Sequence, residues 1–346
     1  MKTKNTIKLA LNLLITGLFS MNAFAQGTSI DENLKESLRK EYFTVNMLMQ
    51  TEGRYSFGDE KIYGRSQFGV ANARISIRGN LDKGFFYRLY TNFSSEPELL
   101  DAFIGYKLGE GLRITTGQMK PKQTLDYIPN PGATDFIDRA VITGKLVASR
   151  EIGIALDGNI GDVSYYAGAF NGRNPLEIPE QDDLYFIGRL QYTFRDLVPG
   201  FIQIAVNGSH GGSASGNMGG SGPDIEGKRT TYGADFRLES NQWILAAEYL
   251  AGEYQLLNTS EDEMMDGYYA TLGYAVNDEV TILSRWQNYS LDHQDFNALD
   301  TSSDMLTLGL NIQTTEFISF QVNAEMLMPD NQDNQFGLSG VFQLQF

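Results

Sequence analysis

Basic side chains gather in one irregular segment of the sequence, although the whole chain is acidic, with a formal net charge of −16. Guanidinium and ammonium groups bind carboxylates and phosphates through charge-assisted hydrogen bonds. The segment and the position that follows it carry Lys120, Lys122, Arg139, Lys145 and Arg150. Within residues 119–149 the basic side chains outnumber the acidic ones by one. We therefore predict that the four basic residues within the segment contact anions, and Arg150 belongs to the motif that follows it.

A second basic group lies upstream, where polar residues alternate with apolar ones. The alternation puts four arginines on the polar side: Arg74, Arg78, Arg88 and Arg113. On a water-facing wall such a stripe forms an anion track, whereas on a lipid-facing surface it is destabilising. Ordinary solvated wall charges, partly paired with nearby acids such as Asp101, would give the same pattern. The sequence leaves both interpretations open.

Residue types that other chemistries need are scarce. The chain has no cysteine and two histidines, His210 and His293, which fall in different predicted loops. We find no nucleophile with a preorganised base, no phosphate-binding loop and no cluster of metal ligands in the sequence. We therefore expect no enzyme activity, no metal and no cofactor. The acidic net charge argues against nucleic-acid binding.

Short alternating segments must position the basic residues. Ile75 and Ile77 share one side of their segment, while Arg74, Ser76 and Arg78 share the other. This period of two predicts a β-strand with two different faces. The same signal predicts sixteen strands, at 42–50, 67–81, 84–93, 99–108, 111–118, 150–160, 163–170, 184–194, 201–208, 229–239, 242–253, 267–276, 280–290, 304–313, 317–327 and 335–346.

The lengths of the connections distinguish between the possible all-β folds. Seven short turns, such as those at 82–84 and 161–162, alternate with eight longer loops. A soluble sandwich has no reason to sort its connections in this way, whereas outer-membrane barrels have short periplasmic turns and longer extracellular loops. We therefore predict a 16-stranded antiparallel up-and-down transmembrane β-barrel. A lumen of this width is not filled by side chains, so we expect a water channel.

The ends of the sequence indicate export to a membrane. Residues 1–25 combine three lysines, an apolar run and Ala23-Phe24-Ala25, which is typical of a cleaved secretory signal peptide. Residues 26–41 are interpreted as a short periplasmic lead-in, and residues 42–346 as the transmembrane barrel. The terminal Phe346 resembles the signal that the barrel-assembly machinery recognises. We expect the outer membrane of a Gram-negative bacterium, with its lipid and lipopolysaccharide as the surroundings.

The segment at 119–149 interrupts the regular pattern for about 31 residues. It contains three prolines, and apolar residues such as Phe136 and Ile142 give it side chains to bury. A long loop that can pack in this way is usually functional rather than disordered. We expect it to fold inward against the barrel wall, as a constriction loop that narrows the channel.

Two further features are assigned to loops. Residues 208–222 are rich in glycine and serine, which is typical of a flexible loop. The later connections at 171–183, 254–266, 291–303 and 328–334 are acidic. The alternative function is therefore a structural or adhesive outer-membrane barrel that uses its acidic surface loops.

Several motifs in the first half of the chain resemble a known family. They are ARISIRGNL at 73–81, LRITTGQMKP at 112–121, FIDRA at 136–140 and SREIGIALDG at 149–158. These sequences resemble the phosphate-selective porin O/P family of outer-membrane channels. The resemblance implies a sixteen-stranded barrel, usually a homotrimer, through which small solutes diffuse. It also implies that basic residues of a constriction loop grip anions, at positions that Lys120, Arg139 and Arg150 match.

The sequence departs from this family in the chemistry of the constriction. Asp126, Asp135 and Asp138 are interleaved with the basic residues, and no dense lysine cluster is present in the segment. We therefore expect an outer-membrane porin that forms a water-filled diffusion channel for small hydrophilic solutes. Its preference for phosphate-like anions is expected to be weak.

Overall fold

The computed structural model describes residues 42–58, 62–63, 66–147, 150–172, 184–217, 224–256, 262–291, 302–330 and 332–346. The chain divides into two units, Met1–Thr44 and Val45–Phe346, and the second unit contains the barrel. The predicted signal peptide (1–25) and lead-in (26–41) lie outside the described residues.

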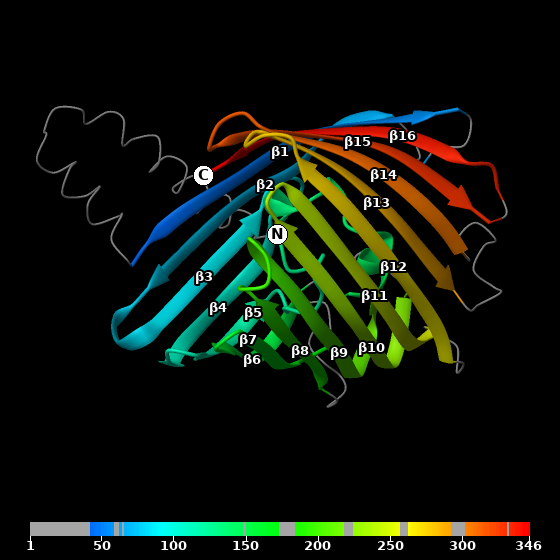
Figure 1. The fold of residues 1–346 in the computed structure, drawn as a ribbon. Helices are drawn as coiled ribbons and strands as arrows, with labels where there is room; N and C mark the ends of the chain where they lie inside the picture. Colours follow the sequence, from blue (N-terminus) through cyan, green and yellow to red (C-terminus); the bar gives the residue numbers. More distant parts are fainter. Residues whose placement is uncertain are drawn as a thin grey trace, which may run out of the picture. The chain divides into compact units, whose positions relative to one another are not determined.

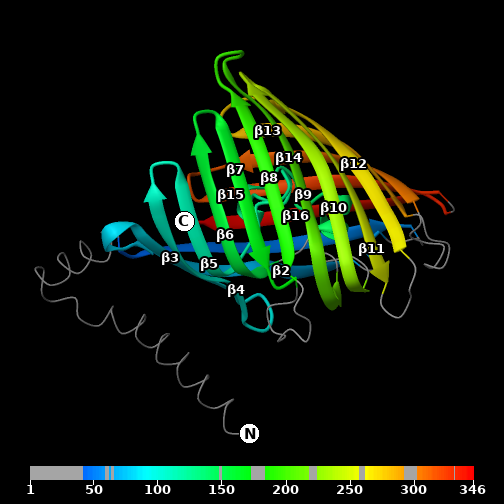
Figure 2. The same cartoon turned by 90° about the horizontal axis from the view of Figure 1, so that it is seen from below.

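Sixteen strands pair in sequence order into one closed antiparallel barrel (Figures 1 and 2). The strands are β1 (Thr44–Phe57), β2 (Gln67–Asn80), β3 (Phe85–Asn92), β4 (Glu98–Gly109), β5 (Leu112–Met119), β6 (Glu151–Ile160), β7 (Val163–Phe170), β8 (Tyr185–Phe194), β9 (Gly200–Asn217), β10 (Asp224–Ser240), β11 (Trp243–Leu256), β12 (Asp262–Ala275), β13 (Val280–Leu291), β14 (Ser302–Gln313), β15 (Ile318–Pro329) and β16 (Gln335–Gln345). The predicted 16-stranded antiparallel barrel is therefore confirmed.

The barrel closes where β1 pairs with β16. Beyond the last residue of β16, Phe346 exchanges two backbone hydrogen bonds with Met47 of β1. The Met47 N–H donates to Phe346 O at 2.8 Å, and the Phe346 N–H donates to Met47 O at 3.1 Å. The C-terminal residue therefore completes the ladder that closes the sheet.

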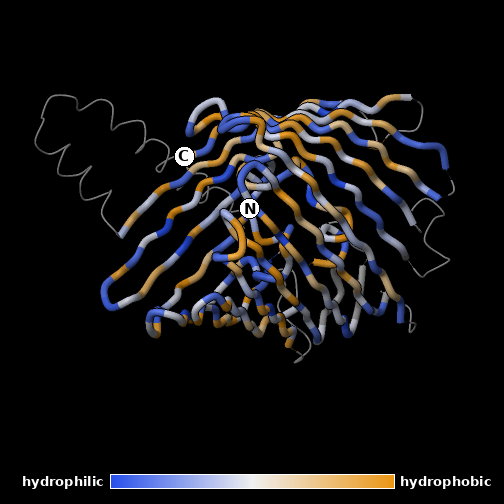
Figure 3. Tube along the Cα trace, viewed as in Figure 1, coloured by the Kyte–Doolittle hydropathy of each residue, from blue (hydrophilic) through white to orange (hydrophobic). Residues whose placement is uncertain are grey.

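The two faces of the sheet are the reverse of those in a water-soluble barrel. The apolar side chains of Ile104, Leu190 and Leu308 remain 58%, 53% and 53% exposed on the outer face. Polar side chains of the inner face are buried, including those of Thr307 and Asn323. Figure 3 shows apolar and polar residues alternating along the strands. An apolar exterior around a polar interior is the pattern of a barrel in a lipid bilayer.

The two ends of the barrel differ in their connections. At one end, called here the short-turn end, the strands join through brief turns such as η2 (Asp82–Gly84) and residues 161–162. Lys83 and Asn241 adopt positive φ values of 61° and 52° in these turns, as tight hairpins require. At the opposite, long-loop end, the connection between β5 and β6 covers residues 120–150.

Several strands extend further toward the long-loop end than the alternation predicts. β1 continues to Phe57, β9 continues into the glycine- and serine-rich run as far as Asn217, and β10 and β12 begin at Asp224 and Asp262. The prediction of a flexible loop is therefore wrong for residues 208–217. Glycines hide the alternation of side chains but not the backbone pairing, which sets His210 opposite Thr230. His293 lies outside the described residues.

Helical structure in the described residues consists of short pieces: η2, η3 (Pro131–Ala133) and α3 (Val141–Leu146). In the part of the chain that the structure describes, no helix is both long and apolar enough to cross a membrane. Both η3 and α3 belong to the long connection between β5 and β6, so this connection has a defined local structure.

Aromatic side chains form two bands on the outer face. Near the short-turn end, three pairs of aromatic rings have centroids 4.8 Å apart: Phe85 with Tyr106, Trp243 with Tyr274, and Phe320 with Phe342. Toward the long-loop end, exposed rings belong to Tyr232, Tyr249, Tyr268 and Trp286. Such rings prefer the interface between lipid and water, so the two bands are typical of the borders of a membrane-embedded zone.

Candidate functional site

The connection between β5 and β6 lies inside the barrel, bound to polar side chains of the inner wall. Gln123 Nε2 donates a hydrogen bond to Thr231 Oγ1 of β10 at 2.6 Å. Glu248 of β11 accepts from the backbone N–H groups of Leu125 and Asp126, at 2.9 and 3.3 Å. Because irregular backbone lacks ladder partners, these wall side chains satisfy amides that would otherwise be buried without a hydrogen bond.

Wall amides hold the next part of the connection by donating to its backbone carbonyls. The pairs are Asn311 Nδ2 to Asp135 O at 2.8 Å, Gln321 Nε2 to Thr134 O at 3.0 Å, Gln343 Nε2 to Gly132 O at 3.1 Å and Gln50 Nε2 to Pro131 O at 3.3 Å. Two ion pairs add to them, Arg237 with Asp135 at 2.8 Å and Arg54 with Asp138 at 2.6 Å. Residues 131–138 are thereby fixed to the wall.

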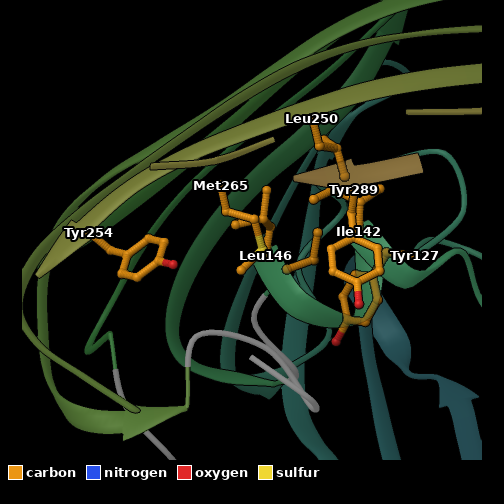
Figure 4. Close-up of a cluster of buried hydrophobic side chains, with 8 residues drawn as sticks. Tyr127, Ile142, Leu146, Leu250, Tyr254, Met265 and Tyr289 are labelled. Atoms are coloured by element: carbon orange, nitrogen blue, oxygen red, sulfur yellow. The ribbon is translucent and has the colours of Figure 1, made fainter. Parts of the chain in front are cut away.

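Apolar side chains of the same connection pack on the inner wall of β11–β13 (Figure 4). Ile142 and Leu146 of α3, together with Tyr127, form a buried cluster with Leu250 and Met265. Burying an aliphatic side chain of this size contributes roughly 1.5–3 kcal/mol. This side of the lumen is therefore occupied by protein.

Five basic side chains come together where the connection faces β2, β3 and β4, and we call them the basic cluster: Arg74, Arg88, Lys120, Arg139 and Arg150. Arg88 Nη1 and Arg150 Nε both pair with Asp101, at 3.3 and 3.2 Å, and that carboxylate is almost fully buried. Lys120 Nζ and Arg139 Nη2 both donate to the carbonyl of Pro129, at 2.8 and 2.5 Å. The cluster unites three predicted constriction residues with two of the predicted arginine stripe.

Arg74 is the least engaged member of the basic cluster. Its guanidinium lies 5.8 Å from the centroid of the Tyr90 ring. Within the described residues it forms no hydrogen bond and no ion pair. A guanidinium carries five N–H donors, so Arg74 can offer several of them to a solute.

Burial among like charges weakens the proton affinity of Lys120. Burial, followed by the positive charges of Arg139, Arg150 and Arg74, lowers the pKa of Lys120 to about 6, although Asp101 acts in the opposite direction. Burial also lowers the pKa of Arg139. Guanidinium groups nevertheless remain charged near neutral pH. The basic cluster therefore combines four lasting positive charges with one that depends on pH.

The other predicted basic residues lie elsewhere in the lumen. Lys122 Nζ pairs with Asp157 at 2.7 Å, and Arg113 pairs with the same carboxylate. Lys145, at the end of α3, lies 5.1 Å from the centroid of an aromatic ring of β13. Arg78 lines a cavity near the short-turn end. The structure therefore does not gather all nine predicted residues at one point.

Two cavities lie along β1, β2 and β16, at successive levels of the barrel. The upper cavity, of about 330 Å³, is nearer the long-loop end, and its lining includes Gln50, Glu52, Arg54, Arg74, Asp138 and Arg139. The lower cavity, of about 450 Å³, is nearer the short-turn end, and its lining includes Leu48, Ser76, Arg78, Arg88, Glu316 and Gln343. The basic cluster contributes residues to both linings, so it spans the level between them.

Sequence reasoning missed the wall side chains that hold the connection. Gln50, Gln321 and Gln343 belong to no motif, and their one signal is a place on the polar face of their strands. The pair formed by Arg54 and Asp138 joins residues 84 positions apart. Local patterns carry no information about contacts of that separation, so these partners emerge from the fold.

Known proteins provide an independent comparison. The family model for phosphate-selective porin O and P matches residues 43–193 and 205–339. Among solved structures, the chain is similar to an anion-selective porin from Comamonas acidovorans, with 15% identity and a TM-score of 0.66 over 88% of this chain and 99% of that one.

Two further solved structures have the same fold. OmpF of Salmonella typhi, in complex with daunomycin, has 11% identity and a TM-score of 0.66 over 88% of this chain and 97% of that one. OprB of Pseudomonas putida has 11% identity and a TM-score of 0.64 over 90% of this chain and 96% of that one. No curated protein sequence matches the chain.

Proposed function

The chain belongs to the phosphate-selective porin O and P family, and we propose that it forms a water-filled diffusion channel for small solutes with a weak preference for anions. The family and the barrel fold place it in the outer membrane of a Gram-negative bacterium. The apolar outer face and the polar inner face support a barrel that spans lipid and encloses water. The two cavities along β1, β2 and β16 mark one part of the lumen that is available to solutes beside the β5–β6 connection.

The imbalance of charge in the basic cluster is the observation that carries the anion preference. Its five basic side chains share one ion-paired acid, Asp101, which two arginines hold and which is almost fully buried. Two unit charges 4 Å apart interact by about 1 kcal/mol in water and by about 4 kcal/mol near a protein surface. A passing anion is attracted by an energy of this order, and a cation is repelled.

Arg74 gives the cluster its means of contact with a solute. An anion that reaches the level between the two cavities loses part of its water, and guanidinium N–H groups replace that water as donors. An anion beside Lys120 also favours the protonated form of this lysine, whose pKa is about 6. Conduction needs a site that is strong enough to admit the ion and weak enough to release it.

Acidic side chains limit the preference. The negative charge of Asp126 lies close enough to Arg139 to offset part of its positive charge. Asp157 does the same for Arg113 and Lys122, with which it forms ion pairs. Among the described residues, the basic side chains of the lumen therefore do not form the uninterrupted array of cations that a dedicated phosphate trap would need. A general pore with weak anion preference fits this distribution of charge.

Reversal potential in a planar bilayer under a KCl gradient tests the proposal. The purified full-length chain should give stepwise ion currents and a potential of the sign that chloride preference produces. Arg74→Ala should reduce this preference, whereas Arg195→Ala should leave it unchanged, because Arg195 pairs with Asp162 at the exposed short-turn end. A cation-selective sign in the wild type would refute the anion preference.

The remaining predictions are part of the same proposal. The β5–β6 connection acts as the constriction, the short-turn end faces the periplasm, and the long loops face outward. Residues 1–25 direct export, Phe346 is recognised by the barrel-assembly machinery, and lipid and lipopolysaccharide surround a homotrimer. The acidic connections that would serve an adhesive barrel fall mostly on residues outside the described ranges, so we do not propose that function.

The family and the fold indicate a channel rather than an enzyme, and the geometry around the described histidine supports this view. Ser209 and His210 are neighbours in β9, so their side chains point to opposite faces of the sheet. Ser209 accepts a hydrogen bond from the Tyr185 hydroxyl at 2.5 Å. His210 Nδ1 lies 2.9 Å from Thr230 Oγ1 in an exposed position. These two residues are not arranged as a nucleophile and its base.

A further inference from the structure

The upper cavity presents charges of both signs, which attraction of anions alone does not require. Its lining includes three basic residues, Arg54, Arg74 and Arg139, and two acids, Glu52 and Asp138. The lower cavity instead combines Arg78 and Arg88 with Glu316. The presence of Glu52 and Asp138 in the upper cavity therefore has to be explained by something other than attraction of anions.

Glu52 and Asp138 share one cation. Arg54 Nε donates to Glu52 Oε2 at 3.0 Å, and its two terminal nitrogens donate to both oxygens of Asp138, at 2.6 and 2.9 Å. Two carboxylates on one guanidinium leave one negative charge in excess. A carboxylate accepts about four hydrogen bonds, and the Asp138 side chain is 45% exposed. This side of the cavity can therefore accept donors from a solute.

Among the described residues, the other two basic side chains of the lining, Arg74 and Arg139, form no ion pair with Glu52 or Asp138. Asp138 and Arg139 are consecutive, but Asp138 binds Arg54 of β1, whereas Arg139 binds the carbonyl of Pro129. Arg74 of β2, which has no hydrogen bond or ion pair within the described residues, lines the same cavity. The cationic groups of Arg74 and Arg139 thus stay separate in their pairing from the carboxylates of Glu52 and Asp138, which share Arg54.

From this separation we infer that the upper cavity binds zwitterionic solutes of the amino-acid and dipeptide class. The carboxylate of the solute faces Arg74 and Arg139, and its ammonium group faces Glu52 and Asp138. A cavity of about 330 Å³ accommodates a molecule of this size. The inference rests on the proposed channel function and specifies a class of solute that enters the lumen.

Anions, cations and zwitterions differ in the number of favourable charge interactions that they can form in the upper cavity. In the upper cavity, a simple anion is attracted by Arg74 and Arg139 and repelled by the carboxylates of Glu52 and Asp138. A cation is attracted by the carboxylates and repelled by the guanidinium groups. A zwitterion places each charge beside its opposite, so both charge-assisted interactions form together. Each such hydrogen bond contributes about 1.5–3 kcal/mol, so loss of one weakens binding by roughly ten- to a hundredfold.

Titration of the open-channel conductance with three matched compounds measures this preference. Glycylglycine has both charges, N-acetylglycine lacks the ammonium group, and glycylglycinamide lacks the carboxylate. A solute that binds in the lumen obstructs the flow of KCl and reduces the current. In the purified full-length protein, half-maximal reduction should occur at a roughly ten- to hundredfold lower concentration for glycylglycine than for either comparison compound.

Substitutions of the two acids test whether the preference for glycylglycine arises in the upper cavity. Glu52→Gln with Asp138→Asn should raise the half-maximal concentration of glycylglycine to that of N-acetylglycine, without weakening N-acetylglycine. Glu52→Gln alone should give a smaller change in the same direction, and its side-chain oxygen still accepts from Arg54, so the fold is preserved. Asp162→Asn, which removes an acid that pairs with Arg195 at the exposed short-turn end, should change neither compound.

The outcomes separate this inference from the channel itself. Ion currents with equal effects of glycylglycine and N-acetylglycine would overturn zwitterion binding and leave the channel intact. Glycylglycine preference that survives removal of both acids would also overturn it, because the ammonium group would then lie elsewhere. Absence of any ion current from the wild type would overturn the channel and this inference with it.

Discussion

Replacement of Lys120 by methionine should abolish a pH dependence of ion selectivity. The pKa of Lys120 is about 6 because of burial and the charges of Arg139, Arg150 and Arg74. The lysine is mostly neutral above this pH and mostly charged below it. Lowering the pH from about 7.5 to about 5 therefore adds a positive charge to the basic cluster, while most carboxylates stay ionised. The anion preference of the wild type should rise over this interval.

The magnitude follows from the position of the added charge in the lumen. A unit charge acts on an ion 4 Å away with about 1 kcal/mol in water, which corresponds to a roughly fivefold change in anion occupancy. Less complete hydration increases the effect, so fivefold is a lower estimate. Lys120 Nζ lies 4.4 Å from the centroid of the Tyr127 ring; methionine keeps an unbranched side chain at this position but cannot take up a proton. The variant should therefore keep the weaker preference at every pH in this range.

Reversal potentials measured at a series of pH values provide the assay. Lys107→Met is the matched control, because Lys107 hydrogen-bonds to Asn80 at 3.4 Å in an exposed position, away from the cluster. His210→Asn is the second control, because this side chain lies on the outer face of β9, away from the lumen. If Lys120→Met retains the pH dependence of the wild type, another group titrates and the reasoning is wrong.

Three further changes test the packing and the hydrogen bonds around the connection. Phe136→Ala should destabilise the protein by about 3–5 kcal/mol, seen as a lower thermal unfolding midpoint in detergent, whereas Ile128→Ala at a half-exposed position should have little effect. Arg189→Ala leaves the fully buried carboxylate of Asp235 without its partner and should cost about 3–5 kcal/mol. Adding Asp235→Ala should recover part of that loss of stability. Gln343→Ala removes the bond to Gly132 O and should increase the noise of the open-channel current without reversing its selectivity; unchanged noise would show that this bond does not hold the connection still.

The barrel could be predicted from the sequence because the side chains of each strand alternate between the outer face and the lumen, and these two surroundings require different residue types. In β14, Leu306, Leu308 and Leu310 face outward and Thr307 faces the lumen, so the alternation identifies the strand. The same signal fails where glycine replaces side chains, as in the second half of β9. Backbone pairing continues there, because the hydrogen bonds of a ladder do not depend on side chains.

The candidate site could be predicted only in part. Lys120, Arg139 and Arg150 fall in motifs, and the structure brings them together with Arg74 and Arg88. Lys145 belongs to the same segment but lies against β13, because burial of Ile142 and Leu146 fixes α3 on β11–β13. The position of a charged side chain in the connection thus depends on where the apolar residues beside it are buried against the barrel wall.

The distribution of acids was also beyond the reach of sequence patterns. Asp138 is near Arg139 in the sequence, and a count of charges treats the two as cancelling. In the structure Asp138 pairs with Arg54 of β1, and Arg139 turns toward Pro129. The partners of these two side chains, which a count of charges does not show, therefore affect what a solute meets in the upper cavity.

Removal of the connection tests most directly the claim that it narrows the channel and sets its selectivity. Met119 and Glu151 are paired neighbours in β5 and β6, so a short glycine-serine turn in place of residues 121–149 can join the two strands without disturbing the barrel. The account predicts a larger single-channel conductance and a loss of anion preference in this variant. An intact barrel with the conductance and reversal potential of the wild type would contradict it.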